Sequence, residues 1–565
     1  MPSGRRRPSM PTSIALVLSL AVVLCAGTAS AQQGSCVSTG KISAPLLLGH
    51  GITLGDGDEF GDAVADLGDL DGAGPSVRAL AVGAINDDDG GPHRGAVYIL
   101  FLDGVGEILS TSKISATQGN FTGVLDFGDE FGSAIASLGD LDGAGPSVLA
   151  IAVGVINDDD GGPDHGAVYV LFLNAQGTVI AQQKINNFQG NFTPALDDND
   201  EFGGAVAGLG DLDGAGPSAG ALAVGCVYDD DGGLDRGCVY ILFLNSAGSV
   251  LSTQKIGNNS ILMTGQLGDG DNFGEDVCSL GDLDGPGGSA RAIAIGSVGD
   301  DDGGSDHGSV YIVFLNSAGA MTSRQKISDT QGNFLGPLLV DDNFGTAVVG
   351  LGDIDGPGGS ATALAVGVAG FDGPGGLDQG AIYVLFLDAT GKTVGYQEIS
   401  SVAGGFGYTI HNTDEFGSGL CALGDLDGSA AGVQTLVCGV GFDDDGGLDR
   451  GCVYLMNLAG AASVGVGDMP VLTGIALGAP RPNLFTQRTS IPFRLEQAAQ
   501  VRIEVRDLAG RQVRTLVDAT MGAGEHQVPW DGTDATGRHL SAGAYFVRMA
   551  VAGRTVGATK AVLLR

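Results

Sequence analysis

Basic residues are scarce in this chain: its 565 residues include 27 Lys and Arg against 66 Asp and Glu, a net charge of −39. Residues 1–31 hold three arginines, and residues 481–565 hold 12 basic against 7 acidic residues, so residues 32–480 carry −47. Such acidity disfavours nucleic acids and anionic membranes as partners. It favours divalent cations or basic surfaces, and it also serves solubility.

Apolar runs long enough to span a bilayer are absent after the N-terminus. At the N-terminus, three arginines (residues 5–7), the run IALVLSLAVVLCAG and the tripeptide ASA before Gln32 predict a secretory signal peptide at residues 1–31. We therefore expect an exported protein of bacterial type, secreted or held at the outer surface, with no transmembrane segment.

Motifs of common catalytic and zinc sites are also missing. The chain has no C-x-x-C or Cys/His zinc spacing, no G-x-S-x-G, no H-E-x-x-H, no P-loop and no dinucleotide fingerprint. Carboxylates suited to glycosidase-type chemistry are plentiful, but they repeat along the chain, whereas an active site breaks the symmetry of its scaffold. The sequence therefore favours a protein that is not an enzyme and has no catalytic residue.

Seven cysteines remain when Cys25 of the signal peptide is set aside. Cys226 and Cys238 stand near the places that Cys438 and Cys452 take in another repeat. Export permits disulfides, while small buried hydrophobic residues in strands are an equal alternative. The sequence leaves the pairing open.

Six repeats of about 71 residues dominate the chain. A Phe-Gly pair marks each of them, at Phe60, Phe131, Phe202, Phe273, Phe344 and Phe416. Each repeat reads as four short strands: FGSAIASLG, LAIAVG, GAVYVLFL and a last strand ending in Lys-Ile, separated by Gly- and Asp-rich turns. The fold class predicted is all-β, a six-bladed β-propeller of four-stranded blades over residues 32–460.

The sixth repeat lacks a Lys-Ile strand, and residues 40–49, GKISAPLLLG, supply a matching segment before the first repeat. We expect this N-terminal strand to complete the last blade and so to close the ring, which removes free sheet edges.

These motifs, Phe-Gly, GDLDG, LAVG and GAVY in constant order over residues 40–460, resemble the FG-GAP repeats of integrin α-subunit propellers and their bacterial relatives. The resemblance implies adhesion or ligand binding, and calcium in the loop between the first two strands of a blade. Only the first two ligand positions of the family's loop carry over. They are Asp69, Asp71, Asp140, Asp142, Asp211, Asp213, Asp282, Asp284, Asp353, Asp355, Asp425 and Asp427. The alternative is a turn in which Asp caps its own backbone.

A second acidic motif, DDDGG, follows the second strand of five repeats, at the opposite end of that strand from GDLDG. Six residues at about 3.3 Å each separate the two motifs by roughly 20 Å, so they cannot share one ion. DDDGG and the acidic connection between repeats open on the same face, where they form either a second metal or ligand site or a solvated turn. The candidate residues are Asp87, Asp89, Asp158, Asp160, Asp164, Asp229, Asp231, Asp235, Asp300, Asp302, Asp306, Asp443, Asp445 and Asp449.

Residues 461–480 read as a linker, and residues 481–565 as a small, Arg-rich β-sandwich. PNLF (482–485), DLAGRQVRTL, WDGTDATG and GAYFVRM resemble the Ig-like domain of flagellar hook-capping proteins and bacterial sorting domains. The resemblance implies secretion or surface-anchoring machinery as a partner. A plain structural Ig-like module is the alternative.

Together these features predict a secreted or surface-attached adhesion protein that presents an acidic, calcium-loaded propeller face to a protein or glycan ligand. A hydrolase or lyase with its site in the central channel is one alternative. An architectural surface protein is another.

Overall fold

A computed structural model describes residues 33–460, apart from 73–76, 144, 146–147, 215–219, 286–287, 356–359, 374–375 and 427–433, and most of residues 476–563. The predicted signal peptide lies outside the described residues. The chain divides into two compact units, one containing Ala31–Ser463 and the other Val464–Arg565. None of the described helices is long and apolar enough to cross a membrane.

The described part of the first unit is built from six four-stranded antiparallel sheets, numbered here by repeat. Sheets 1 to 3 are β2(Phe60–Gly68), β3(Val77–Ala84), β4(Ala96–Asp103), β5(Ile108–Ser115); β6(Phe131–Gly139), β7(Val148–Val155), β8(Ala167–Asn174), β9(Val179–Ile185); and β10(Phe202–Gly210), β11(Gly220–Cys226), β12(Cys238–Leu244), β13(Val250–Gly257). Sheets 4 and 5 are β14(Phe273–Gly281), β15(Arg291–Ser297), β16(Ser309–Leu315), β17(Met321–Ile327); and β18(Phe344–Gly352), β19(Thr362–Val368), β20(Ala381–Leu387), β21(Thr393–Ile399). The all-β class is thus confirmed.

Sheet 6 combines the two ends of this unit. Its strands are β22(Gly419–Gly424), β23(Gln434–Val440), β24(Cys452–Leu458) and β1(Cys36–Ser43), which pairs antiparallel with β24. The strand expected at residues 40–49 therefore lies earlier, at 36–43, and residues 44–49 form the short helix α1(Ala44–Gly49). Pro45 in the first turn explains the change, because proline cannot donate to a sheet but suits a helix start.

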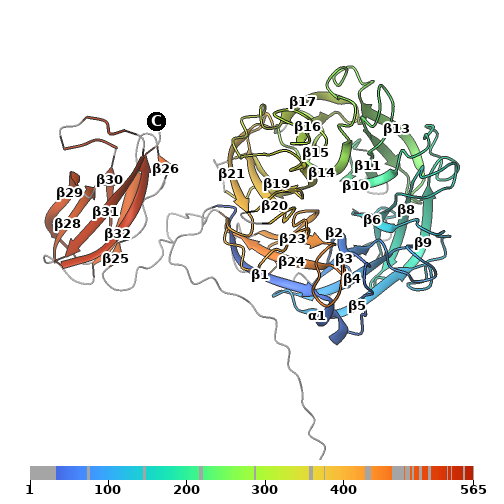
Figure 1. Ribbon diagram of the computed structural model, residues 1–565, viewed down its shortest axis with the longest axis horizontal. Coiled ribbons are helices and arrows are strands. Elements are labelled where there is room, and N and C mark those ends of the chain that lie inside the picture. Colours follow the sequence, from blue (N-terminus) through green and yellow to red (C-terminus); the bar gives the residue numbers. More distant parts are fainter. Residues whose placement is uncertain are drawn as a thin grey trace, which may run out of the picture. The chain divides into compact units, whose positions relative to one another are not determined.

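The sheets stand around a common centre (Figure 1). The first strands of successive sheets, β2, β6, β10, β14, β18 and β22, contact one another in order, and β22 contacts β2. Six hydrophobic clusters each combine residues of two neighbouring sheets, including one that joins sheet 6 to sheet 1 through Val453, Leu423 and Leu80. Burial is therefore shared between neighbouring sheets.

Glycine allows the inner strands to come this close. A Cβ added to Gly439 in sheet 6 would overlap the carbonyl oxygen of Gly61 in sheet 1, and Gly225 has the same relation to Gly274. Gly61 and Gly274 themselves have φ of 114° and 109°, a region that L side chains rarely adopt. The Phe-Gly and LAVG motifs are thus the two sides of one backbone contact between sheets.

The second unit is a pair of small sheets. One contains β25(Ala476–Leu477), β27(Thr489–Leu495) and β30(Gly524–Trp530). The other has the order β26(Leu484–Phe485), β32(Arg554–Leu563), β31(Gly543–Val551), β28(Ala499–Arg506), β29(Gln512–Met521). Trp530, Phe493 and Val547 are buried in their common core. β25 comes from the segment predicted as a linker, 461–480, most of which lies outside the described residues.

Candidate functional site

The first aspartate of each DDDGG motif is buried and paired with lysine. Asp87 is 3% exposed; its Oδ2 lies 2.8 Å from Nζ of Lys113 in β5 and accepts a 2.9 Å hydrogen bond from Tyr98 Oη. The same lysine lies 2.6 Å from Oδ2 of Asp89, the third aspartate of the motif. The ammonium therefore lies between the two carboxylates, where a bridging cation would otherwise be needed.

This arrangement recurs in five sheets. The Lys–Asp–Asp groups are Lys113 with Asp87 and Asp89, Lys184 with Asp158 and Asp160, Lys255 with Asp229 and Asp231, Lys326 with Asp300 and Asp302, and Lys41 with Asp443 and Asp445. Burial lowers the pKa of Lys184, but hydrogen bonds to Asp158 and Asp160 outweigh it and raise that pKa to about 12. The lysine thus remains charged at any physiological pH.

The middle aspartate of the motif faces away from the lysine. Asp159 Oδ1 accepts a 3.0 Å hydrogen bond from the backbone N–H of Asp164, and Asp160 N–H bonds Asp158 Oδ1 at 3.2 Å. Asp164 has φ of 50°, and its counterparts Asp235, Asp306 and Asp449 have φ of 48°, 50° and 47°. Among residues other than glycine, Asp and Asn adopt left-handed backbone most readily. The backbone conformation therefore explains why an aspartate stands at these four positions.

Sheet 5 lacks both the DDDGG motif and the lysine that pairs with it in the other sheets. Its loop reads FDGPGG instead of DDDGG, and Glu398 replaces the lysine of the last strand. Glu398 there accepts a 2.8 Å hydrogen bond from Ser400 Oγ. This paired exchange is visible in the sequence, because the last strand ends in Lys-Ile wherever DDDGG occurs and in Glu-Ile where DDDGG is missing. We did not predict the ion pair from this signal.

The GDLDG aspartates lie at the other end of the second strand, where several of them bind their own loop. Asp284 accepts 2.8 Å hydrogen bonds from Ser289 N–H and Oγ, Asp355 bonds Ser360 in the same way, and Asp140 accepts Gly145 N–H at 3.1 Å. Asp69, Asp211, Asp282 and Asp353 are exposed, and Asp427 lies outside the described residues. This geometry matches the capping turn; calcium at these loops stays a prediction.

The acidic connections between sheets contribute a ring of buried aspartates: Asp58, Asp129, Asp200, Asp271, Asp342 and Asp414. Each accepts a backbone N–H from three residues earlier, as in Asp126 N–H to Asp129 Oδ2 at 2.7 Å. Burial nevertheless raises the pKa of Asp129 to about 6, and that of Asp200 likewise. These carboxyls hold the connections in shape.

A cavity of about 550 Å³ lies among the first strands of all six sheets. Its lining includes six carboxylates: Asp62, Asp66, Glu201, Glu275, Asp276 and Glu415. Four of them break the sixfold repeat, namely Asp62, Asp66, Glu275 and Asp276, and Asp66 is paired with Arg78. At the place of Asp62 and Glu275 the other repeats have Ser133, Gly204, Thr346 and Ser418, and at the place of Asp276 they have Ala or Gly. These residues were not predicted, because most acids of the chain recur from repeat to repeat and hide the few that do not. Alignment of the six Phe-Gly motifs reveals them.

Asp62, Glu275 and Asp276 are protonated more readily than ordinary carboxyls. Burial, and then repulsion from Glu59, Glu130, Glu275 and Glu415, raises the pKa of Asp62 to about 7. Burial alone raises that of Glu275 to about 7, and Asp276 reaches the same value although the N–H groups of Val348 and Val277 donate to it. None of the ion pairs found in the described part of the chain involves these three residues.

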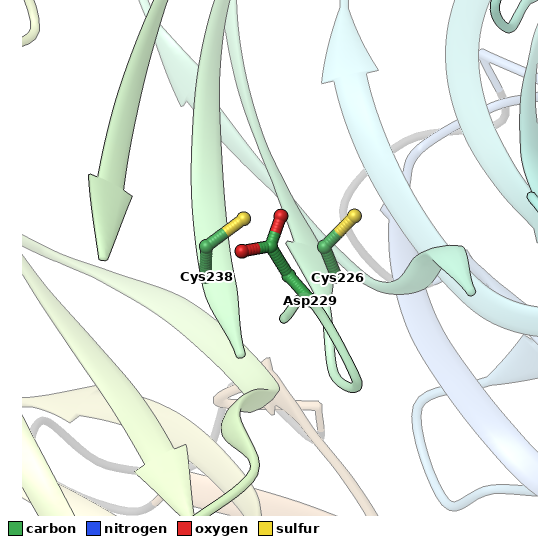
Figure 2. A group of neighbouring side chains, drawn as sticks. All are labelled: Cys226, Asp229 and Cys238. Carbon is green, nitrogen blue, oxygen red and sulfur yellow. The ribbon is translucent and has the colours of Figure 1, made fainter. Parts of the chain in front are cut away.

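One further group gathers potential metal ligands. Cys226, Asp229 and Cys238 bring two Sγ atoms and a carboxylate oxygen within 4.8 Å of one another, and they are the one such trio among the described residues (Figure 2). All three are buried. Asp229, however, is also the partner of Lys255.

Comparison with known proteins gives one family match, to the FlgD Ig-like domain over residues 482–554. This confirms the resemblance of the C-terminal module to hook-capping proteins. No curated protein matches the chain.

Several solved structures show a remote likeness to the chain. One is alkylpurine DNA glycosylase AlkC from Pseudomonas fluorescens, with 16% identity, 16% of this chain and 30% of that chain covered, and a TM-score of 0.13. Another is FlgD from Pseudomonas aeruginosa, with 22% identity, 13% of this chain and 59% of that chain covered, and a TM-score of 0.12. A third is PorZ, a surface component of the type-IX secretion system of Porphyromonas gingivalis. It has 13% identity, 90% of this chain and 60% of that chain are covered, and the TM-score is 0.33. The chain thus spans less than two thirds of each, and such TM-scores do not define a fold.

Proposed function

We propose that this chain is an exported binding protein whose six sheets are the blades of a closed β-propeller of the FG-GAP type. Two observations support closure: β22 contacts β2, and β1 completes sheet 6 beside β24. In this proposal the signal peptide directs export, and the FlgD-type module serves secretion or surface retention.

The ligand site proposed is the central channel where it opens on the DDDGG face. The observation that carries this proposal is the contrast in charge pairing. Each lysine pairs with two of the three aspartates of its loop, whereas Asp62, Glu275 and Asp276 line the cavity and take part in no ion pair found among the described residues. Tyr228 and Phe442 add aromatic surface to the same cavity. Carboxylates beside aromatic rings favour a cationic group, such as a basic side chain of a protein ligand or an amino sugar of a glycan.

The test is calorimetric titration with hexalysine and with a glucosamine oligomer, at low and at high salt. We expect binding that weakens with salt and is lost in an Asp62→Asn, Glu275→Gln, Asp276→Asn variant. A matched control is Asp211→Asn, Asp213→Asn, Asp282→Asn, which removes the same number of charges at the GDLDG end. Equal loss in both variants would contradict a channel site.

Hydrolysis in the channel is the second candidate, favoured by the pKa of about 7 at both Asp62 and Glu275. These residues come from sheets 1 and 4, which are three places apart among the six sheets. Acid–base cleavage of a glycosidic bond uses one protonated and one ionised carboxyl, and near pH 7 each of these two groups can take either form. Turnover of a polysaccharide panel by the native chain, abolished in Glu275→Gln, would establish this function in place of simple binding.

A further inference from the structure

Cys226 and Cys238 face each other across two neighbouring strands of sheet 3. Cys226 is the last residue of β11, Cys238 the first of β12, and the two are direct partners in the antiparallel register. Both are fully buried. At this rung the other sheets pair Ala84 with Ala96, Val155 with Ala167, Ser297 with Ser309, Val368 with Ala381 and Val440 with Cys452. Two sulfurs therefore meet in sheet 3 alone among these six rungs.

The geometry suits a covalent bond. Directly opposed residues of antiparallel strands have Cβ atoms about 4.5–5.5 Å apart, and a disulfide needs about 3.5–4.5 Å, so a small shift closes the gap. The two Sγ atoms already lie within 4.8 Å of each other, and Figure 2 shows both on the same side of their strands.

A metal ion fits this place less well than a disulfide. Asp229, the third potential ligand, pairs with the ammonium of Lys255, which also lies 2.5 Å from Asp231 Oδ2. A cation bound by the two sulfurs and Asp229 would have to displace this lysine. A disulfide needs no such change, because it carries no charge and uses no carboxylate.

We propose that Cys226 and Cys238 form an intramolecular cross-strand disulfide in the exported protein. The proposal rests on the export that the proposed function includes, because export supplies an oxidising compartment.

The reaction is thiol–disulfide exchange with an external disulfide, either oxidised glutathione or a protein dithiol oxidase. One cysteine, as thiolate, attacks the oxidant and forms a mixed disulfide; the second thiolate then displaces the oxidant's other sulfur. Two protons and two electrons leave the protein, and the oxidant ends as two thiols. Burial raises the pKa of both thiols in the folded sheet. The thiolates are thus available before the sheet packs, so we expect the bond to form during folding.

Cys438 and Cys452 provide an internal control. They lie in the adjacent strands β23 and β24, but Cys438 is opposite Tyr454 and Cys452 is opposite Val440. Diagonal neighbours of this kind are about 7–8 Å apart, beyond the reach of a disulfide. These two cysteines should remain thiols under conditions that link Cys226 to Cys238.

The experiment is refolding of the purified chain in a glutathione redox buffer, followed by alkylation under denaturing conditions and tryptic mass mapping. Cleavage after Lys184, Arg236 and Lys255 separates the two cysteines. We expect peptide 185–236 to be linked to peptide 237–255, with release by reductant, while Cys438 and Cys452 are alkylated. Alkylation of Cys226 and Cys238, or a zinc or cadmium ion retained by them, would overturn the proposal.

A second measurement uses the Ser297–Ser309 rung as a template. The variant Cys226→Ser, Cys238→Ser should fold, and its guanidinium midpoint should not change with reductant, whereas that of the native chain should fall. A native midpoint that is equally insensitive to reductant would contradict the disulfide. Because the buffer sets the oxidation, this failure would leave the proposals on export and ligand binding untouched.

Discussion

Lys113 and Asp87 form the ion pair that makes an aspartate triplet stable inside this fold, with Nζ 2.8 Å from Oδ2 and the carboxylate side chain 5% exposed. Three adjacent acids in the sequence suggested a metal or a solvated turn. The partner instead comes from the last strand of the same repeat, 26 residues later. Each lysine therefore offsets one of the three negative charges of its DDDGG motif.

Lys113→Met should destabilise the protein by about 3 kcal/mol, because it leaves Asp87 buried without a counter-charge. Chemical unfolding at neutral pH measures the change. Lys392→Met, at an exposed lysine, is the control and should cost less than about 0.5 kcal/mol. Equal effects of the two substitutions would show that the buried pair is not special.

Gly439→Ala should destabilise the contact between sheets 6 and 1, because the new methyl group would overlap the backbone of Gly61. Overpacking of this kind typically costs about 1–3 kcal/mol. Gly49→Ala is the matched control, since a Cβ there meets nothing within 4 Å. A thermal melt of each variant gives the comparison, and an unchanged melting temperature for Gly439→Ala would argue against tight ring contact.

The channel carboxylates predict a pH dependence of stability. Their pKa values of about 7 in the folded chain lie above the ordinary value of about 4, so between these limits the folded state holds protons that the unfolded state has lost. Stability should therefore fall as pH rises from about 4 to about 7. In the Asp62→Asn, Glu275→Gln, Asp276→Asn variant this slope should be reduced, as measured by melting temperature at pH 5 and pH 8. A parallel slope in both proteins would mean that these three carboxyls have ordinary pKa values.

Calcium at the GDLDG loops is tested by melting the protein with EDTA and then with millimolar calcium. Two carboxylates per loop are few for Ca²⁺, so we expect affinity in the millimolar range and a small rise in melting temperature. Substitution of Asp282 and Asp353 by Asn should remove part of that rise. No bound calcium and an unchanged melt would leave the capping turn as the role of these loops.

The sequence predicted the repeat and its four strands well because Phe-Gly, LAVG and GAVY recur at constant spacing. The N-terminal strand was placed a few residues late, since GKISAPLLLG resembles the later repeats without revealing that Pro45 begins a helix. The role of Lys113 and its counterparts was overlooked because the aspartates that pair with them are distant in the sequence; Asp87, for example, lies 26 residues before Lys113. The hairpin of the third and fourth strands brings these two residues together. Asp62, Glu275 and Asp276 were overlooked because the repeated acids elsewhere hid these three, which do not repeat.

The pairing of β1 with β24 has a consequence for the order of assembly. Lys41 bonds Asp443, a residue 402 positions away. Synthesis delivers β1 first and β24 last, so sheet 6 cannot be completed until both ends of this unit are present. Such a distant contact carries a high loop-closure entropy and is expected to form late. Under the export and ring closure proposed above, the chain would cross the membrane before its ring is finished, and the docking of β1 onto β24 would be the step that commits it to the folded state.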